Sequence, residues 1–416
     1  MAAIPGRRSS LQCARPCNHL QLCGSRLALL WTLDAGHCLD GDAQIDGRGS
    51  LMPISPVRIV LKALLIVIVL NLAFAAINPH VGRLSIYNGL VRGRERFPRG
   101  GYDDAYNLGP QDLDATVAAH VISSRKAPNE YRVVILGDSS TWGPLLAPSE
   151  TMTGRLNSKR LSACGKSIRF FNLGYPDPSA LKDFIILSRA RHLQPDLVVW
   201  MLARESFTIG KLPTLYGAES TDQLHALFEQ YGLSRYDEYL LPSPSLLDKT
   251  IFGQRRRLKR LILLQADGPL WDATGRDYQK FTYQPAIQVL DPIPSEPQPS
   301  SNNPASVPST RRAFPVLDAA HRMIGDLPVL LVNEPRYLGL KKGNTNTAAA
   351  SNLRKKYDDF RVQLQYYATL NNWSYVDLHD LVLPEDFTNN VFHLNASGEA
   401  KLARALSAKV LSVACP

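Results

Sequence analysis

A serine in the first half of the chain has the surroundings of a catalytic nucleophile. Ser139 lies in the stretch Gly137-Asp138-Ser139-Ser140, directly after the apolar run from Val133 to Leu136. Such a run predicts a strand buried on both faces, and open α/β sheets place their chemistry just past the carboxyl ends of their strands. A serine there can attack a carbonyl while nearby backbone N–H groups receive the developing oxyanion. An ordinary strand-to-helix turn with a polar N-cap is the alternative.

A histidine close to the C-terminus is the second candidate. His393 lies in the stretch FTNNVFHLNASG, residues 387–398, between the last expected strand and the last expected helix. In a doubly wound sheet this loop can lie on the same edge as Ser139. A lone histidine is usually structural or exposed, but the following Leu394, Asn395 and Gly398 sharpen the signal.

Alternating strands and helices are expected to position these two residues. Strands are predicted at 133–136, 168–173, 197–202, 329–332 and 375–378. Helices are predicted from 149–150 past 161, at 179–193, at 349–370 and from 397 onward. This alternation is typical of α/β proteins with a parallel, doubly wound sheet.

The alternation stops between residues 212 and 310. The first part, to about residue 280, reads as helical and irregular, and residues 285–308 are rich in proline, which predicts a disordered or extended loop. We interpret 212–310 as an insertion into one α/β domain formed by 100–211 and 311–416. The basic run at 255–260 fits an amphipathic helix on a membrane surface, but a solvated helix face is the more frequent arrangement.

An apolar segment near the N-terminus predicts a membrane anchor. Residues 59–77 read IVLKALLIVIVLNLAFAAI and are interrupted only by Lys62 and Asn71. This length can cross the apolar core of a bilayer, roughly 30 Å thick, so we expect a single-pass transmembrane helix at 57–78. A signal peptide and a buried helix of a soluble protein are the alternatives. Basic residues flank both sides, and the positive-inside rule alone leaves the orientation undecided or places the large domain in the cytoplasm.

The first 51 residues differ from the rest of the chain. We expect a disordered leader at 1–51 and suspect that translation begins near Met52. Its four cysteines match no zinc-binding spacing: Cys13, Cys17, Cys23 and Cys38. Outside it, Cys164 and Cys415 are too few to argue for or against an oxidising compartment.

Composition narrows the possible partners. The 416 residues carry a formal charge of +10, and 45% are hydrophobic, which is enough for a substantial core. The charge suits nucleic acid or an anionic surface, and without a nucleic-acid motif or a Lys-rich tail we favour the surface and expect no nucleic-acid partner. No metal-ligand cluster is apparent, and no cofactor is expected. A flavodoxin-like nucleotide binder is a weak alternative, because no glycine-rich fingerprint follows the first strand.

The motifs around Ser139 and His393 resemble those of the SGNH/GDSL hydrolase superfamily, and membrane-anchored bacterial members are the most similar. The resemblance covers roughly residues 130–210 and 327–412. It implies a flavodoxin-like three-layer α/β/α sandwich in which Ser139 is the nucleophile, His393 is the general base and the Ser139 N–H helps to form the oxyanion hole. Such proteins remove or transfer acyl groups, often acetyl, on carbohydrates or lipids, so the implied partner is an acylated carbohydrate or lipid.

Two oxyanion positions depart from the family pattern. Asp177 occupies the position of the usual oxyanion-hole glycine, with Gly174 close by, and a carboxylate there is unfavourable unless it points away. Glu205 replaces the usual asparagine, and an ionised glutamate only accepts hydrogen bonds; it could donate only if a raised pKa kept it protonated. Arg204 is the candidate for supplying positive charge instead.

The position of the family's acid also departs from the pattern. Asn390 stands three residues before His393, where the family has aspartate. An amide can orient an imidazole but stabilises imidazolium less well, and the equivalent change in a serine protease costs about 10⁴-fold in turnover. Asp386 or Glu385 could substitute. The chain is therefore expected to be a membrane-anchored serine esterase or acyltransferase, with a weak or inactive relative that binds a glycan or a protein partner as the alternative.

Overall fold

The computed structural model describes residues 55–99, 106, 109, 111–208, 216–276, 313–337, 348–388 and 390–415. The expected leader at 1–51 and the Pro-rich stretch at 285–308 lie outside these residues. The chain separates into two compact units, Met1–Ile59 and Val60–Pro416. Apart from the first turn of the N-terminal helix, the elements of the fold belong to the second unit.

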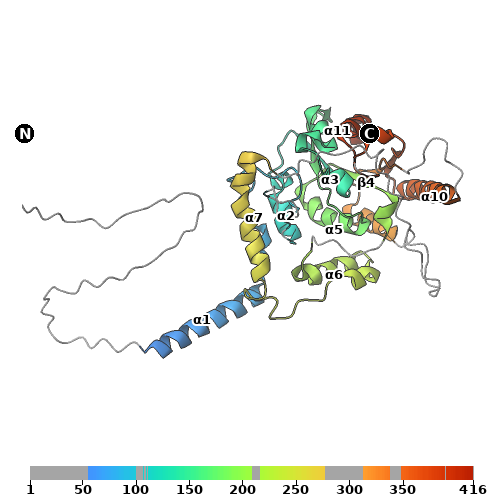
Figure 1. Ribbon diagram of the computed structural model, residues 1–416. Coiled ribbons are helices and arrows are strands. Elements are labelled where there is room, and N and C mark those ends of the chain that lie inside the picture. The colour runs from blue at the N-terminus through green and yellow to red at the C-terminus, as the bar shows by residue number, and fades with distance from the viewer. Residues whose placement is uncertain are drawn as a thin grey trace, which may run out of the picture. The chain divides into compact units, whose positions relative to one another are not determined.

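A six-stranded sheet forms the centre of the domain, in the order β2-β3-β1-β4-β5-β6 (Figure 1). The five longer strands are parallel, and they are β1 (Glu130–Leu136), β3 (Lys166–Asn172), β4 (Leu197–Leu202), β5 (Val329–Asn333) and β6 (Ser374–Asp377). The short β2 (Ser162–Ala163) pairs antiparallel with β3 at the edge. Without β2, the order of the strands along the chain is the 2-1-3-4-5 order of flavodoxin-like folds, so the predicted fold class is confirmed.

Helices cover both faces of the sheet. Successive residues of β1 point to opposite faces and all are buried, as expected for a strand between two layers. One face packs on α5 (Ala180–Ala190), α9 (Pro315–Ile324) and α10 (Ala348–Leu370). The other packs on α4 (Met152–Ser158) and α11 (Ala396–Ala414). This arrangement is the predicted α/β/α sandwich.

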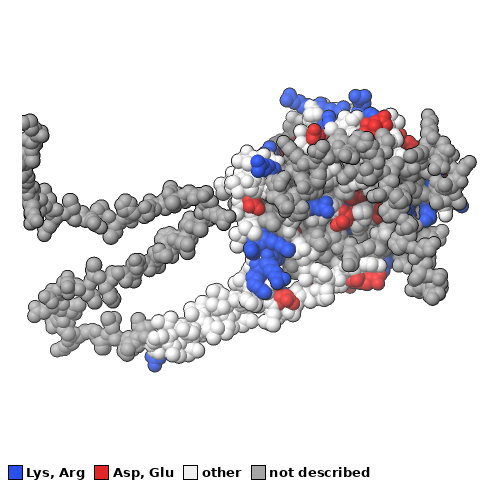
Figure 2. Space-filling view, in the orientation of Figure 1, with Lys and Arg blue, Asp and Glu red and all other residues white. Residues whose placement is uncertain are grey.

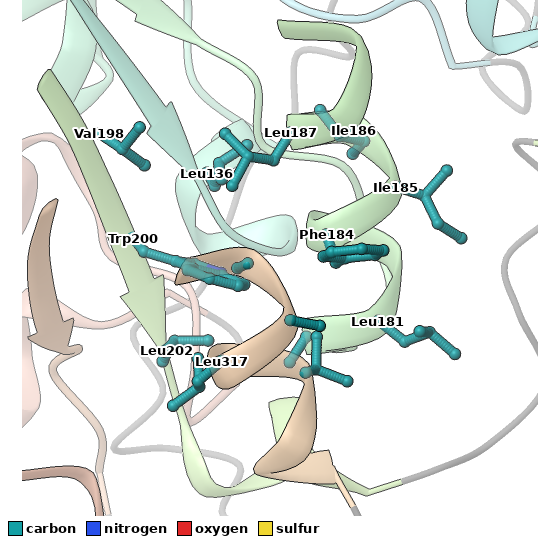
Figure 3. Packing of buried hydrophobic residues seen from close by; sticks show 14 of the residues in the cluster. Leu136, Leu181, Phe184, Ile185, Ile186, Leu187, Val198, Trp200, Leu202 and Leu317 are labelled. Atoms are coloured by element: carbon teal, nitrogen blue, oxygen red, sulfur yellow. The ribbon is translucent and has the colours of Figure 1, made fainter. Parts of the chain in front are cut away.

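The core of the first face contains large side chains from strands and helices. Figure 3 shows Trp200 of β4 beside Phe184 of α5 and Leu317 of α9, and all three are fully buried. Each such apolar side chain contributes roughly 1.5–3 kcal/mol through removal from water. This packing holds rigid the strands whose ends carry the site.

The elements before and within the sheet domain differ in part from the prediction. The helix predicted from 149–150 past Leu161 is shorter, because α4 ends at Ser158 and the chain then turns into β2 and β3 through Cys164 and Gly165, which both have positive φ. Elements that the sequence reading missed are α2 (Leu113–Ala119) and α9. One-turn 3-10 segments connect other elements, at Val81–Arg83, Val121–Ser123, Pro148–Glu150, Arg191–Leu193, Arg204–Phe207 and Pro384–Asp386.

Within the region proposed as an insertion, residues 216–276 form helices. Its elements are 3-10 turns at Ala218–Ser220 and Ser234–Tyr239, α6 (Thr221–Gln230) and α7 (Arg255–Thr274). Helix α7 includes Pro269 and ends at Gly275, whose φ of +63° terminates it in the left-handed region.

An apolar helix, α1 (Pro56–Ile77), occupies the predicted anchor. Over the described part of the chain it is the one helix long and apolar enough to cross a membrane, and 6% of its most apolar window is buried. Its side chains are therefore not those of a core helix.

A disulfide joins the last residues of the chain to the sheet. Cys164, in the β2–β3 turn, is bonded to Cys415, which follows α11. The sequence reading did not pair these two cysteines because 251 residues separate them.

Candidate active site

Ser139 is the first residue of the short helix α3 (Ser139–Trp142), which follows β1 directly. The Asp138 carboxylate caps this helix by accepting a hydrogen bond from the Ser140 amide at 2.8 Å. Gly137 precedes the cap because the close packing requires it: a Cβ there would lie 2.2 Å from Thr141 Oγ1. The sequence Gly-Asp-Ser thus ends the strand, caps the helix and presents the serine at the carboxyl edge of the sheet.

His393 is held in a short loop before α11. The His393 carbonyl accepts hydrogen bonds from the Thr388 backbone N–H at 2.8 Å and from its hydroxyl at 3.0 Å. Asn395 caps α11 by accepting from the amides of Ser397 and Gly398. Gly398 is needed for close approach, since a Cβ would lie 2.8 Å from the Asp386 carbonyl. The residues following the histidine therefore have structural roles that fix the loop.

The serine and the histidine meet. His393 Nε2 lies 2.8 Å from Ser139 Oγ, although 254 residues separate the two in the chain. Burial lowers the pKa of His393 to about 4, while the charge of Asp138 acts in the opposite direction. The imidazole is therefore neutral at pH 7, as a general base must be before it takes a proton.

Asn390 contacts the other nitrogen of the imidazole. Its Nδ2 lies 2.7 Å from His393 Nδ1. Its Oδ1 accepts from the backbone amides of Phe392 at 2.9 Å and His393 at 2.7 Å, which fixes the orientation of the amide. Because Asn390 Nδ2 can only donate, Nδ1 accepts and the ring proton lies on Nε2. This tautomer gives its proton to the Ser139 hydroxyl oxygen rather than accepting from it, the opposite of what a general base needs.

The two carboxylates considered as substitutes for the missing acid do not contact the histidine. Asp386 is buried and binds Lys401 Nζ at 2.6 Å and the Leu383 amide at 2.9 Å. Glu385 is exposed, and its backbone carbonyl accepts from Asn395. The expectation that either carboxylate could take over at His393 is corrected by these contacts.

Asp177 has the backbone conformation of the glycine that it replaces. Its φ of +83° lies in the left-handed region, and its side chain is exposed. Its amide has no hydrogen-bond partner among the residues that the structure describes. Gly174, the other candidate, donates its N–H to Asn172 Oδ1 at 3.0 Å, and a Cβ there would lie 2.8 Å from Thr141 and Trp142 atoms. Of the two amides, that of Asp177 is thus the one without an acceptor in the described residues, and Gly174 serves close packing.

A buried lysine links two segments of the site. One is the turn at residues 137–140, the serine turn, and the other is the loop after β3 at residues 173–178, the Asp177 loop. Lys182 Nζ is fully buried and donates to the carbonyls of Gly137 at 2.8 Å and Tyr175 at 2.6 Å. Its charge is balanced by Asp183 at 3.0 Å. The sequence reading missed this residue because it lies on a buried side of α5, where an apolar residue is expected.

Glu205 forms a polar cluster with residues of other elements. Its carboxylate accepts from the Tyr357 hydroxyl at 2.8 Å and pairs with Arg336 at 3.1 Å and Arg204 at 3.4 Å. It therefore acts as an acceptor. Arg336, which follows β5, also lies 3.6 Å above the Phe392 ring beside His393. The sequence reading missed Arg336, although its position just after a strand was an available signal.

A second buried carboxyl group lies behind the serine turn. The Ser140 hydroxyl donates to Glu334, which follows β5. Burial, together with the negative charge of Asp138, raises the pKa of Glu334 well above its ordinary value. Strand-end position could have identified this residue too.

Over the described ranges, no group of three or more His, Cys, Asp or Glu side chains could hold a metal ion.

No family model and no curated protein matches the chain. Solved structures that it resembles include an aryl esterase of M. smegmatis (15% identity, 68% of this chain and 99% of that chain, TM-score 0.30). Others are a carbohydrate acetylesterase from Sinorhizobium meliloti (15%, 68% and 98%, 0.30) and a putative lipolytic protein of the G-D-S-L family from Desulfitobacterium hafniense (11%, 67% and 98%, 0.31). These are proteins of the kind that the sequence resemblance names, but at these TM-scores they carry no argument. The functional inference rests on the site itself.

Proposed function

We propose that this chain is a membrane-anchored serine ester hydrolase or O-acyltransferase of the SGNH/GDSL type. The observation that carries the proposal is the 2.8 Å contact between Ser139 Oγ and His393 Nε2 at the carboxyl edge of the sheet. A hydroxyl and an imidazole at this distance are the two groups that acyl transfer needs. In this mechanism His393 first takes up the tautomer with its proton on Nδ1, which Asn390 disfavours; Ser139 then attacks the ester carbonyl, its proton passes to the free Nε2, and His393 protonates the leaving alkoxide.

The oxyanion of the tetrahedral intermediate needs donors nearby. The backbone N–H of Ser139 at the start of α3 is one, and the Asp177 amide, with its glycine-like φ of +83°, is the proposed second. Water, or the hydroxyl of a carbohydrate or lipid acceptor, then attacks the acyl-enzyme. The first route is hydrolysis and the second is acyl transfer.

We propose that the catalytic domain lies outside the cytoplasm. Disulfides persist mainly in oxidising compartments, so the Cys164–Cys415 bond favours this side of the membrane, whereas the flanking charges leave the orientation undecided or favour the cytoplasm. Acylated carbohydrate or lipid of the cell envelope would be within reach of a domain anchored there by α1.

A second candidate function is glycan or protein binding with little catalysis. Asn390 favours it, because the hydrogen bond from its amide to Nδ1 at 2.7 Å holds His393 in the unproductive tautomer. Both candidates use the site around Ser139 and His393, and they differ in turnover.

Turnover of p-nitrophenyl acetate by the full chain in detergent separates the two candidates. We expect slow hydrolysis that falls to background in Ser139→Ala and in His393→Ala. The exposed residues Ser412 and His192 supply matched controls, Ser412→Ala and His192→Ala, which should retain the wild-type rate. Equal background rates in all five proteins would remove simple ester hydrolysis and leave binding, or transfer to an acceptor not supplied.

A further inference from the structure

A run of exposed apolar side chains precedes α7. Leu246, Leu247 and Phe252 are 59%, 76% and 70% exposed, and Leu241 and Ile251 are exposed as well. Single exposed apolar residues are ordinary, but several within one short segment mark a surface that meets another apolar phase.

This segment contacts the apolar helix α1. The Phe252 amide donates to Asn71 Oδ1 at 3.0 Å. Asn71 lies six residues before the end of α1 at Ile77, which is about 9 Å along the helix axis. If α1 crosses a bilayer, the segment therefore lies within about 9 Å of the end of the crossing helix, close to where that helix passes from hydrocarbon to headgroups.

Helix α7 packs along residues 86–92, which follow α1 in the chain. The Ile86 amide donates to Gln265 Oε1 at 2.9 Å, and the Tyr87 hydroxyl donates to the Leu264 carbonyl at 2.8 Å. Further along both segments, Arg92 pairs with Asp272 at 3.2 Å. These contacts advance along both segments in the same direction, so the N-terminal end of α7 is the end nearest α1.

Positive charge gathers at this end of α7. Arg255, Arg256 and Lys259 are exposed on its first turns. Figure 2 shows Lys and Arg side chains concentrated there beside the end of α1, whose residues 63–77 include no Lys, Arg, Asp or Glu. Arg255 also lies 4.4 Å above the Phe252 ring. Apolar side chains with basic residues just beyond them are the pattern of an interfacial surface on anionic lipid.

We propose that residues 241–259 form a membrane-docking surface. Leu246, Leu247 and Phe252 enter the interface of the bilayer that α1 crosses, and Arg255, Arg256 and Lys259 contact anionic headgroups. The inference rests on the proposed anchoring by α1 and goes beyond it. The domain is held against the membrane by a second contact, at the N-terminal end of α7, in addition to its covalent link to α1.

Quenching by nitroxide-labelled lipids tests the apolar contact. The full chain, with Cys13, Cys17, Cys23 and Cys38 changed to Ser, carries a thiol-linked fluorophore at Leu247→Cys in vesicles of equal phosphatidylcholine and phosphatidylglycerol. Leu65→Cys in α1 is the positive control, and Leu370→Cys, exposed on α10, is the negative control. We expect quenching at positions 247 and 65 and none at 370.

The outcomes separate the inference from the anchor on which it rests. Quenching at 65 without quenching at 247 overturns the docking surface and leaves the anchor in place. No quenching at 65 overturns both. Equal quenching at 247 and 370 also overturns the docking surface, because the fluorophore alone would then explain it. Residue 247 shielded from the aqueous phase but unquenched by lipid would indicate a protein partner and would equally overturn it.

Charge substitution tests the headgroup contact. Arg255→Gln, Arg256→Gln and Lys259→Gln together should reduce quenching at 247 about twofold or more, because each basic residue near an anionic surface contributes to binding. A control with the same charge loss on other exposed positions, Arg354→Gln, Lys355→Gln and Lys409→Gln, should leave it unchanged. Equal quenching in phosphatidylcholine alone would overturn the headgroup contact.

Discussion

At the scale of single residues, the contact between His393 and Asn390 sets the expected rate. The imidazole lies 2.8 Å from Ser139 Oγ, but the amide of Asn390 places the ring proton on the nitrogen that faces the serine. Two backbone amides hold Asn390 Oδ1 and oppose a flip of the side chain. The proposed general base is therefore close enough to the serine and held in the wrong tautomer.

Asn390→Asp should raise kcat, by up to about 10⁴-fold, because a carboxylate accepts the Nδ1 proton and frees Nε2 to act as a base. The same carboxylate stabilises imidazolium and so raises the pKa of His393 from about 4. The acid limb of the kcat/KM profile should move from near pH 4 toward neutral pH. Asn372→Asp, on an exposed turn, is the matched control. An unchanged rate and an unchanged acid limb would contradict this account of Asn390.

Asp177→Gly should raise both kcat and stability. Glycine has no Cβ to strain at a φ of +83°, so the free energy of unfolding should rise by about 1 kcal/mol, and the loss of a carboxylate near the oxyanion should speed acylation. Asp177→Asn removes the charge and keeps a side chain, so it should raise kcat with little change in stability. Urea unfolding and kcat measured on both variants check this. A fall in kcat in both would show that the carboxylate contributes to the reaction.

The sequence was informative about which residues meet, and less so about what surrounds them. Gly-Asp-Ser after a strand and His393 before the last helix predicted a contact that the structure contains. The partners of Glu205 could not be predicted, because Tyr357 and Arg336 come from elements more than a hundred residues away along the chain. Contacts of this range depend on packing, and neither spacing nor periodicity encodes them.

At the scale of elements, the carboxyl ends of the strands assemble the site and α5 holds it. Lys182 bonds the carbonyls of Gly137 and Tyr175 and so links the end of β1 to the loop after β3. The alternation of strands and helices was predictable because apolar runs and helical periods repeat along the chain, and the three-layer arrangement was implied by the resemblance. The shorter α4 and the unpredicted α9 were not, because turn geometry at Cys164 and tertiary burial of α9 outweigh local propensity.

Lys182→Met should lower kcat with little change in KM, because the Asp177 loop loses its tie to the serine turn. The variant should also lose roughly 3–5 kcal/mol of stability, since Asp183 is left buried and unpaired. The double variant Lys182→Met/Asp183→Asn removes that unpaired charge, and its urea midpoint should recover while kcat stays low. Recovery of both together would assign Lys182 to stability alone.

At the scale of the whole molecule, α1 and the disulfide are the two features that indicate the cellular compartment of the domain. The apolar length of α1 was readable from composition, whereas the Cys164–Cys415 bond required the fold to bring the β2–β3 turn to the end of α11. A covalent link over 251 residues restricts the unfolded chain strongly.

Thiol labelling of protein taken from intact cells tests the compartment. We expect Cys164 and Cys415 to resist a maleimide reagent until the protein is reduced, and Cys164→Ser/Cys415→Ser to lose about 2–5 kcal/mol of unfolding free energy. Ser158→Ala/Ser412→Ala is a conservative control on exposed positions. Free thiols in the native protein would place the domain in a reducing compartment.

The central claim is that His393 activates Ser139. Labelling of the full chain with a fluorophosphonate probe, followed by mass spectrometric location of the adduct, tests it most directly, because the probe needs an activated serine and no particular substrate. We predict an adduct on Ser139 that is lost in His393→Ala and forms faster in Asn390→Asp. No adduct on Ser139 in either the wild type or Asn390→Asp would contradict the claim and leave binding as the function of the site.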